Sequence, residues 1–219
     1  MIIFENVSFS YPDIDVLNNV SFKLEDGKFI GILGPNGGGK STFLKLALDL
    51  IKPTDGKIIR TDKKVSYVAQ TTSISDSSFP ASVEEVIYLG LVNNKIDFHY
   101  FKNKKKVEEI MKELSIYDLR KKLVNELSGG QLQKVKIAKA IISDPTLLVL
   151  DEPDAGMDDD AHSNLIRLIN ELHHKKTTIL FVSHHEEDLK EADQIYFIEK
   201  GSILTYEDEL KRGHHHANI

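Results

Sequence analysis

The chain has no cysteine among its 219 residues, which excludes disulfides, thiolate zinc sites and cysteine nucleophiles. It also lacks long apolar stretches: no run approaches the roughly 20 residues that a membrane-spanning helix needs. The N-terminus does not have the basic-then-apolar order of a secretory signal. We therefore expect any attachment to a membrane to come through a partner protein.

An excess of positive charge is lacking as well, since the formal net charge is −6 and the pI is near 5.8. Such a chain has no overall attraction to phosphate backbones, so a nucleic-acid role would need a local basic patch. The one short candidate is the lysine cluster within residues 102–106, and Glu108 and Glu109 follow it at helical spacing. This mixture of charges is typical of a solvated helix face, and we expect no nucleic-acid partner.

Apolar runs that are short and nearly continuous occur at residues 29–33, 147–150 and 178–182. Each run is followed by polar residues and then by a helical pattern. Runs of this kind suit strands that are buried on both faces of a parallel sheet covered by helices. The sequence therefore predicts an α/β fold, with a further hairpin at residues 194–204 that turns at Gly201.

The pattern changes between about residues 71 and 128. A Ser/Thr-rich stretch at 71–78 is followed by mostly helical segments such as 107–114, and charged helices replace the apolar strand runs. We interpret residues 71–128 as a helical lobe inserted between strands of the main sheet of a single domain. The rest of that domain, residues 1–70 and 129–219, is then its core together with a β subdomain.

Residues 34–41 satisfy the pattern G-x-x-x-x-G-K-S/T and stand between a buried strand and a helical pattern at 41–50. Glycines let successive backbone N–H groups turn toward phosphate oxygens, and the positive end of the following helix points at them. Lys40 is expected to reach the β- and γ-phosphates of ATP, Ser41 to bind Mg²⁺, and Thr42 to lie near the α-phosphate. The predicted nucleotide-binding residues of this phosphate loop are Asn36, Gly37, Gly38, Gly39, Lys40, Ser41 and Thr42. A glycine-rich turn that merely precedes a helix is the alternative, and the strand and helix context disfavours it.

Two adjacent carboxylates, Asp151 and Glu152, follow the apolar run at 147–150. They would emerge at the C-terminal edge of the sheet, where α/β proteins bind ligands. Asp151 fits the carboxylate that positions Mg²⁺ in P-loop ATPases, and Glu152 is the candidate to polarise the attacking water. With Pro153, the three residues could instead be an ordinary strand-to-turn junction, an alternative that the phosphate loop makes less favourable.

A second glycine-rich segment, Ser128, Gly129, Gly130 and Gln131, precedes a helical pattern with apolar residues on one stripe. Ser128 is a good N-cap, and the glycines expose N–H groups at the helix start, so this is another phosphate site. It has no lysine or metal carboxylate of its own. A homodimer resolves this, because each chain's Ser128 segment can close over the γ-phosphate held by the other chain's Lys40. A plainly capped helix is the alternative for these residues alone.

In this order and over essentially the whole chain, these motifs resemble the ABC ATPase family. The resemblance implies a P-loop NTPase core with a mainly parallel sheet, an N-terminal antiparallel β subdomain and an inserted α-helical lobe. It further implies that Tyr11 stacks on adenine with Val16 packed nearby. Gln70 is implied to contact Mg²⁺ and the attacking water and to relay to the membrane subunit, and His184 to hold the γ-phosphate end.

Three positions depart from the usual family pattern. Asp154 stands where the family usually has Ser or Thr, which weakens the expected contacts between subunits there, although Asp158 matches and is included among the predicted nucleotide-site residues. Lys134 and Lys139 stand where arginines are frequent, which keeps the charge but loses bidentate geometry. None of the predicted catalytic residues, Lys40, Gln70, Glu152 and His184, is among the departures, so we expect competent hydrolysis.

The residues at positions 34–41 and 79–86 are similar to those of the ATPases of zinc and manganese importers, and nearly as similar to those of iron-chelate importers. The resemblance implies two copies that dimerise on ATP and act on permease subunits at the inner face of the membrane, with a substrate-binding protein. The alternative is a soluble ABC ATPase that serves cofactor or protein-complex assembly. His214, His215 and His216 offer imidazole ligands for zinc or nickel, or are a polar tail or tag remnant.

We predict that Ser128→Arg abolishes ATP turnover and leaves mononucleotide binding, because the phosphate that Ser128 contacts is held by the other chain. Mixing this variant with Lys40→Ala protein should restore one composite site, measured as phosphate release. Complete inactivity of a folded heterodimer would count against assembly of the site from two chains.

Overall fold

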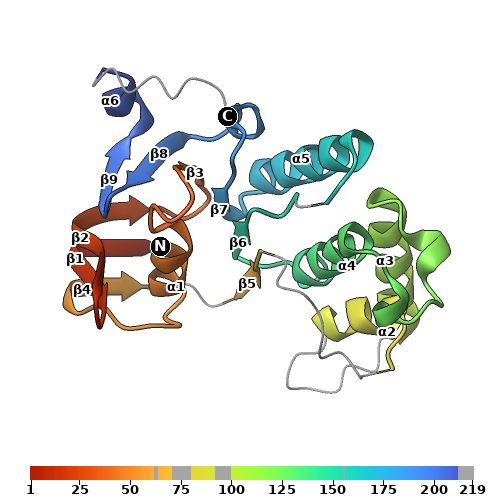
Figure 1. Ribbon diagram of the computed structural model, residues 1–219. Coiled ribbons are helices and arrows are strands. Elements are labelled where there is room, and N and C mark those ends of the chain that lie inside the picture. The colour runs from red at the N-terminus through yellow and green to blue at the C-terminus, as the bar shows by residue number, and fades with distance from the viewer. Residues whose placement is uncertain (62–63, 71–79, 92–99, 155, 212–219) are drawn as a thin grey trace. The chain divides into compact units, whose positions relative to one another are not determined.

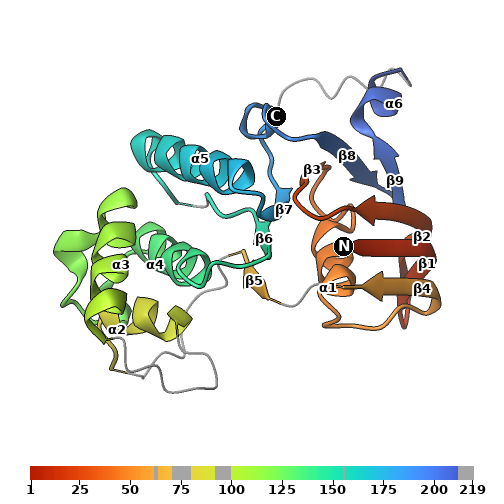
Figure 2. The same ribbon diagram turned by 180° about the vertical axis from the view of Figure 1, so that it is seen from behind.

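The computed structural model describes residues 1–61, 64–70, 80–91, 100–154 and 156–211. The chain forms two units, each with its own core. Unit 1 comprises residues 1–63 and 176–219, and unit 2 comprises residues 64–175. Figures 1 and 2 show the ribbon from opposite sides.

Unit 1 begins with an antiparallel sheet of three strands in the order β2-β1-β4. The strands are β1 (Ile2–Tyr11), β2 (Ile14–Leu24) and β4 (Asp55–Arg60). Alternate residues point inward, and Phe4 lies opposite Phe22 in the register. Both rings pack on Phe43 of α1 (Lys40–Ala47), with ring centroids 4.8 Å and 4.9 Å away. This aromatic cluster fixes α1 against the sheet (Figure 1).

A second group of strands in unit 1 has the order β7-β3-β8-β9. The strands are β3 (Phe29–Leu33), β7 (Thr178–Val182), β8 (Gln194–Glu199) and β9 (Ser202–Thr205). β3 pairs in parallel with β7 and β8, and β9 runs antiparallel to β8. All residues of β3 and β7 are buried, as their apolar runs predicted. The loops that follow β3 and β7 therefore leave the same edge of the sheet.

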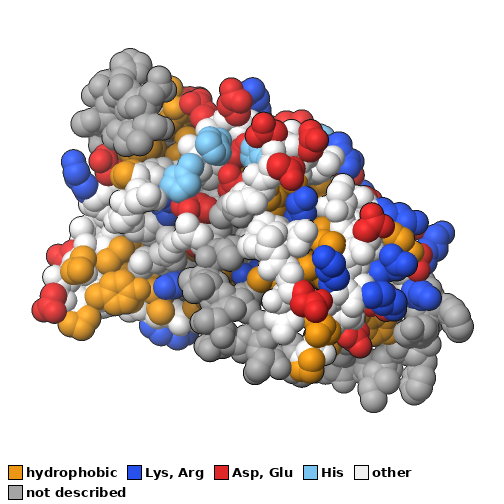
Figure 3. All heavy atoms as spheres, turned by 45° about the vertical axis from the view of Figure 1, so that its right-hand side comes forward, with side chains coloured by type: hydrophobic (Ala, Val, Ile, Leu, Met, Phe, Trp, Pro, Cys, Tyr) orange, Lys and Arg blue, Asp and Glu red, His pale blue; other side chains and the backbone are white. Residues whose placement is uncertain are grey.

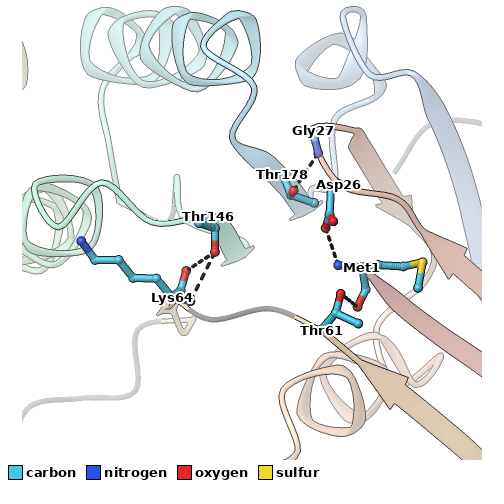
Figure 4. Close-up of polar contacts among 7 residues, drawn as sticks. All are labelled: Met1, Asp26, Gly27, Thr61, Lys64, Thr146 and Thr178. Atoms are coloured by element: carbon cyan, nitrogen blue, oxygen red, sulfur yellow. Dashed lines mark hydrogen bonds and ion pairs between the residues drawn. The ribbon is translucent and has the colours of Figure 1, made fainter.

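Several polar contacts lie at the ends of strands in unit 1, and Figure 4 shows them in close-up. The amino group of Met1 pairs with Asp26, and the hydroxyl of Thr61 donates to the carbonyl of Met1 at 3.4 Å. The N–H of Gly27 donates to the hydroxyl of Thr178 at 2.9 Å. The bond between Gly27 and Thr178 lies where β3 and β7 begin, opposite the edge from which the functional loops emerge.

Unit 2 contains two parallel strands, β5 (Val65–Val68) and β6 (Leu147–Asp151), and two long helices, α4 (Gly129–Ile141) and α5 (Asp159–His174). The hydroxyl of Thr146 donates to the carbonyl of Lys64 at 3.0 Å and accepts from the N–H of Lys64 at 3.3 Å, where the two strands begin (Figure 4). The apolar stripe of α4 that the sequence predicted is buried, with Val135 and Ala138 at 0% exposure and Ile142 at 1%.

Five further helices lie between β5 and α4 in the described part of unit 2. They are α2 (Val83–Tyr88), η1 (Leu89–Leu91), α3 (Tyr100–Glu113), η2 (Tyr117–Leu119) and η3 (Val124–Glu126). Of these, α2, η1 and α3 contact α4. Lys and Arg side chains gather over these helices with Asp and Glu among them, as Figure 3 shows. Lys105, for example, pairs with Glu109 one turn on, at 3.7 Å. The lysine cluster therefore lies on a helix of mixed charge.

The predicted α/β class, the mainly parallel sheet and the antiparallel sheet at the N-terminus are confirmed. The hairpin at Gly201 is also confirmed, since this glycine has a φ of 78° between β8 and β9. The predicted boundaries of the helical lobe, 71–128, stay a prediction. The Ser/Thr-rich stretch and His214–His216 lie outside the described residues. Among the described helices, none is both long and apolar enough to cross a membrane.

Candidate functional site

The phosphate loop connects β3 to α1 and depends on glycine at several positions. Gly34, Gly37 and Gly39 have φ angles of 145°, 75° and 106°, a region that residues with a Cβ rarely adopt. Space is restricted as well, because a Cβ at Gly34 would lie 2.1 Å from the carbonyl oxygen of Ile198. Around Gly37 no other atom lies within 4 Å of such a Cβ, so the backbone there faces open space. The loop can thus present its N–H groups to a ligand.

Lys40, the first residue of α1, is 5% exposed and curls into the loop. Its ammonium group donates to the carbonyl oxygens of Gly34 at 2.9 Å and Pro35 at 3.2 Å. The first turn of α1 carries no acidic residue, so its positive end is not neutralised from within the helix. Ser41 is exposed and Thr42 partly exposed at this end. A cation, backbone donors and hydroxyls together suit a polyphosphate.

Val16 on β2 lies beside the loop. A Cβ at Gly39 would be 3.2 Å from the carbonyl oxygen of Val16 and 3.4 Å from its Cγ1, which places the valine against the start of α1. Tyr11 is 42% exposed at the β1–β2 turn, and its ring meets Phe9 edge to face at 5.0 Å. Its position leaves ring surface for stacking, in keeping with the predicted contact to a base.

The turn after β7 carries His184, whose side chain is exposed. The inner side of this turn is anchored within unit 1, because the hydroxyl of buried Ser183 donates to Asp188 at 2.6 Å. The N–H of His185 donates to the same hydroxyl at 2.9 Å. Since β3 and β7 are adjacent parallel strands, unit 1 brings the His184 turn and the phosphate loop to one edge of the sheet.

In unit 2, Asp151 and Glu152 stand at the end of β6 and are 3% and 8% exposed. The adjacent strand β5 leads to Gln70, whose side-chain amide donates to the Glu152 carboxylate at 2.6 Å. Glu152 has a φ of 47°, in the left-handed region that is strained for most residues other than glycine. No pattern of neighbouring residues predicts this conformation. Strain of this kind is often found at functional sites, where the surrounding structure holds it in place.

Tyr67 was not predicted from the sequence as part of the site. Its hydroxyl donates to Asp151 at 3.5 Å. Burial, followed by the nearby negative charge of Asp151, raises the pKa of Tyr67 to about 12. Tyr67 lies opposite Val149 in the register of β5 and β6, two residues before Asp151 and hence on the same face. This pairing is set by the structure, so the sequence carried no local signal for it.

Ser128 caps α4 as predicted, and the contact is reciprocal. Its hydroxyl accepts from the N–H of Gln131 at 3.3 Å, and its own N–H donates to the Gln131 side chain at 3.2 Å. Gly129 has open space around it, whereas a Cβ at Gly130 would lie 2.2 Å from the carbonyl oxygen of Gly156. Gly130 therefore allows the segment before α5 to approach α4 closely.

Asp158 is the N-cap of α5, where its carboxylate accepts from the N–H of Ala161 at 2.8 Å. This interaction is within one chain and gives Asp158 a structural role in addition to the predicted one at the nucleotide site. Its predicted contact with a nucleotide or a second chain stays a prediction.

In comparisons with known proteins, residues 17–155 match the ABC transporter family. The zinc uptake system ATP-binding protein ZurA of Listeria innocua is 38% identical over 191 residues, which cover 82% of this chain and 74% of that protein. The manganese transport system ATP-binding protein MntB of Halalkalibacterium halodurans is 36% identical over 215 residues, covering 92% and 84%. The structure of cbiO1 from Clostridium perfringens, part of the ABC transporter complex cbiONQ, has a TM-score of 0.76 at 26% identity, covering 96% of this chain and 90% of that one.

The chain therefore belongs to the ABC transporter family, as an ATP-binding and ATP-hydrolysing subunit. ATPases of this family dimerise and work with membrane permease components. The predicted family, fold class and ATPase activity are confirmed, while the roles of individual site residues stay predictions.

The raised pKa of Tyr67 predicts how stability depends on alkaline pH. The neutral phenol is favoured in the folded state, so this stabilisation is complete below pH 10 and is lost as the pH rises toward 12. We expect the free energy of unfolding to fall more steeply between pH 10 and pH 12 for the wild type than for Tyr67→Phe. Denaturant unfolding at several pH values measures this, and parallel curves for the two proteins would contradict it.

Proposed function

We propose that this chain energises the uptake of zinc, manganese or a metal chelate through ATP-driven dimerisation of two copies. The ATPase part depends on one observation, the buried Lys40 ammonium curled into a loop of glycines with positive φ. The metal part is supported by the relatives, which are named as zinc and manganese transport proteins and are 36–38% identical. The proposed partners are permease subunits and a substrate-binding protein, with the chain held at the inner face of the membrane by the permease.

Unit 1 is proposed to bind the nucleotide. Tyr11 stacks on the adenine and Val16 packs beside it, while the loop N–H groups surround the phosphates. Lys40 exchanges its bonds to the Gly34 and Pro35 carbonyls for the β- and γ-phosphate oxygens. This exchange of hydrogen-bond acceptors is favourable, because a charge-assisted bond to an anion is stronger than a bond to a neutral carbonyl.

The oxygen atoms of Asp151, Ser41 and Gln70 are also proposed to hold a magnesium ion. Mg²⁺ prefers hard oxygen ligands, and it is usually bound through one or two carboxylates together with substrate phosphates. Asp151 offers a buried carboxylate at a strand end, Ser41 an exposed hydroxyl at a helix start, and Gln70 an amide oxygen. When bound, the ion would supply positive charge to offset that of the phosphates. Tyr67 is proposed to orient Asp151 for this purpose.

Glu152 is proposed to accept a proton from the attacking water. In the present structure its carboxylate is engaged by the amide of Gln70, and its backbone is held at positive φ. We infer that Gln70 keeps this carboxylate in place before catalysis and then turns to the magnesium ion and the water. His184 is proposed to hold the γ-phosphate end.

The second copy is proposed to complete each site. Ser128, Gly129 and Gly130 stand at the start of α4, whose first turn carries no acidic residue. The helix end is therefore suited to an anion. Its capping contacts are made by Ser128 and Gln131, and no lysine takes part in them. A γ-phosphate supplied by the partner's Lys40 loop satisfies this requirement, and ATP then joins the two copies.

For the catalytic part, we predict that Glu152→Gln lowers ATP turnover by about 10²- to 10⁴-fold, because an amide cannot accept the proton from water. ATP binding should persist and trap a dimer, visible by size-exclusion chromatography with Mg²⁺ and ATP. Glu113→Gln, which changes an exposed carboxylate on α3, is the matched control and should behave as wild type. Phosphate release by Glu152→Gln at the wild-type rate would rule out this role.

For the transported substrate, we predict that cells lacking this chain take up less zinc or manganese at low external metal. Expression of the wild type should restore uptake of the radioactive metal, and Lys40→Ala should not. If uptake of both metals and of their chelates is normal in the deleted strain, while the purified chain hydrolyses ATP, the metal assignment fails and the ATPase assignment stands.

A further inference from the structure

The turn that carries His184 is anchored firmly on its inner side. It continues into η4 (Glu186–Leu189), in which Asp188 and Leu189 are buried. Leu189 packs directly on β3, because a Cβ at Gly31 would lie 2.6 Å from its Cδ1. With the bond from Ser183 to Asp188, these contacts fix the base of the turn and leave His184 on its outer, exposed side.

The outer side of the turn has a contact of its own, from the C-terminal end of unit 1. The hydroxyl of Tyr206 donates to the carboxylate of Glu186 at 2.7 Å. Glu186 is two residues beyond His184, and Tyr206 is the first residue of α6 (Tyr206–Lys211). A hydrogen bond to a charged acceptor is roughly twice as strong as one between neutral groups.

Tyr206 itself is held rigidly, as a positioning group must be. It directly follows β9, where Thr205 lies opposite Tyr196 of β8. The N–H of Asp208 donates to the Thr205 hydroxyl at 3.3 Å, which closes the first turn of α6. The helix also packs against the strands of the hairpin, β8 and β9, so that even Glu209 on α6 is only 4% exposed.

Burial, with the bond to Glu186 and its charge, raises the pKa of Tyr206 to about 12. The phenol therefore remains a hydrogen-bond donor at every pH at which the ATPase is assayed.

We propose that Tyr206 is a positioning residue for His184, acting by holding Glu186 and so fixing the outer side of the turn that carries the histidine. The inference rests on the proposed role of His184 at the γ-phosphate. It extends the site to the C-terminal helix, which none of the nucleotide-binding motifs includes. Small displacements matter here because catalytic groups must be held close to their productive geometry.

The test is steady-state ATP hydrolysis by the full chain carrying Tyr206→Phe, which removes the hydroxyl and keeps the ring. We expect kcat to fall about threefold to tenfold, which corresponds to the loss of one hydrogen bond. KM for ATP should stay within about twofold of wild type, because the contacts of the phosphate loop are unchanged. Tyr196→Phe is the matched control, since that hydroxyl bonds to Gln194 on its own strand.

Substitutions at Glu186 test whether the bond itself is responsible. Glu186→Gln keeps an acceptor oxygen and should retain most of the activity, whereas Glu186→Ala should match Tyr206→Phe. The double variant of Tyr206→Phe and Glu186→Ala should lose no more than either single variant, because both remove the same interaction. In a His184→Ala background, Tyr206→Phe should cause no further loss in single-turnover hydrolysis.

Two results overturn the inference. One is a wild-type kcat for Tyr206→Phe, even with a lower melting temperature, which would make the bond structural only. The other is an equal loss from Tyr206→Phe with and without His184, which would mean that the tyrosine acts through another group. A wild-type kcat for His184→Ala would instead remove the proposed role of His184, and the inference with it.

Discussion

The ammonium of Lys40 and the loop that encloses it impose the main constraint on this structure. For the lysine to reach the carbonyls of Gly34 and Pro35, the chain must turn back over the first turn of α1. Only residues without a Cβ make that path easily, because the φ angles are positive and the carbonyl of Ile198 fills the space at Gly34. The surrounding strands and the aromatic cluster on α1 hold this path in place.

Unit 2 also contains a close backbone approach and a residue with a positive φ angle, but only the first of these falls on a glycine. Gly130 lets the carbonyl of Gly156 lie against the start of α4, as a glycine does in the phosphate loop. Glu152, in contrast, adopts a positive φ although it has a side chain. A glycine there would relieve strain, but it would have no carboxylate to bind Gln70 or to take the part in hydrolysis that is proposed for Glu152.

Strand polarity explains how each unit collects its functional groups. In unit 1 the parallel pair β3 and β7 sends the phosphate loop and the His184 turn to one edge. In unit 2 the parallel pair β5 and β6 does the same for Gln70 and the two carboxylates. The strand starts are tied by hydrogen bonds, so the opposite edges can carry polar groups that serve a ligand. The C-terminal hairpin and α6 add a support for the His184 turn, through Tyr206.

The sequence by itself determined the elements whose causes are local. Apolar runs specified the buried strands, Gly-Lys-Ser spacing specified the phosphate loop, and Ser128 with Gln131 specified a capped helix start, because neighbouring residues supply these interactions. Even here the end of α1 differed: the helical pattern extends to Leu50, whereas the helix ends at Ala47, before Asp49 takes a φ of 62°. The tertiary structure alone decided the bond of Tyr67 to Asp151, the strained backbone of Glu152 and the contact of Tyr206 with Glu186. Two of these are contacts between residues far apart in the sequence, and the third is a conformation imposed by surrounding groups, so no local spacing encodes them.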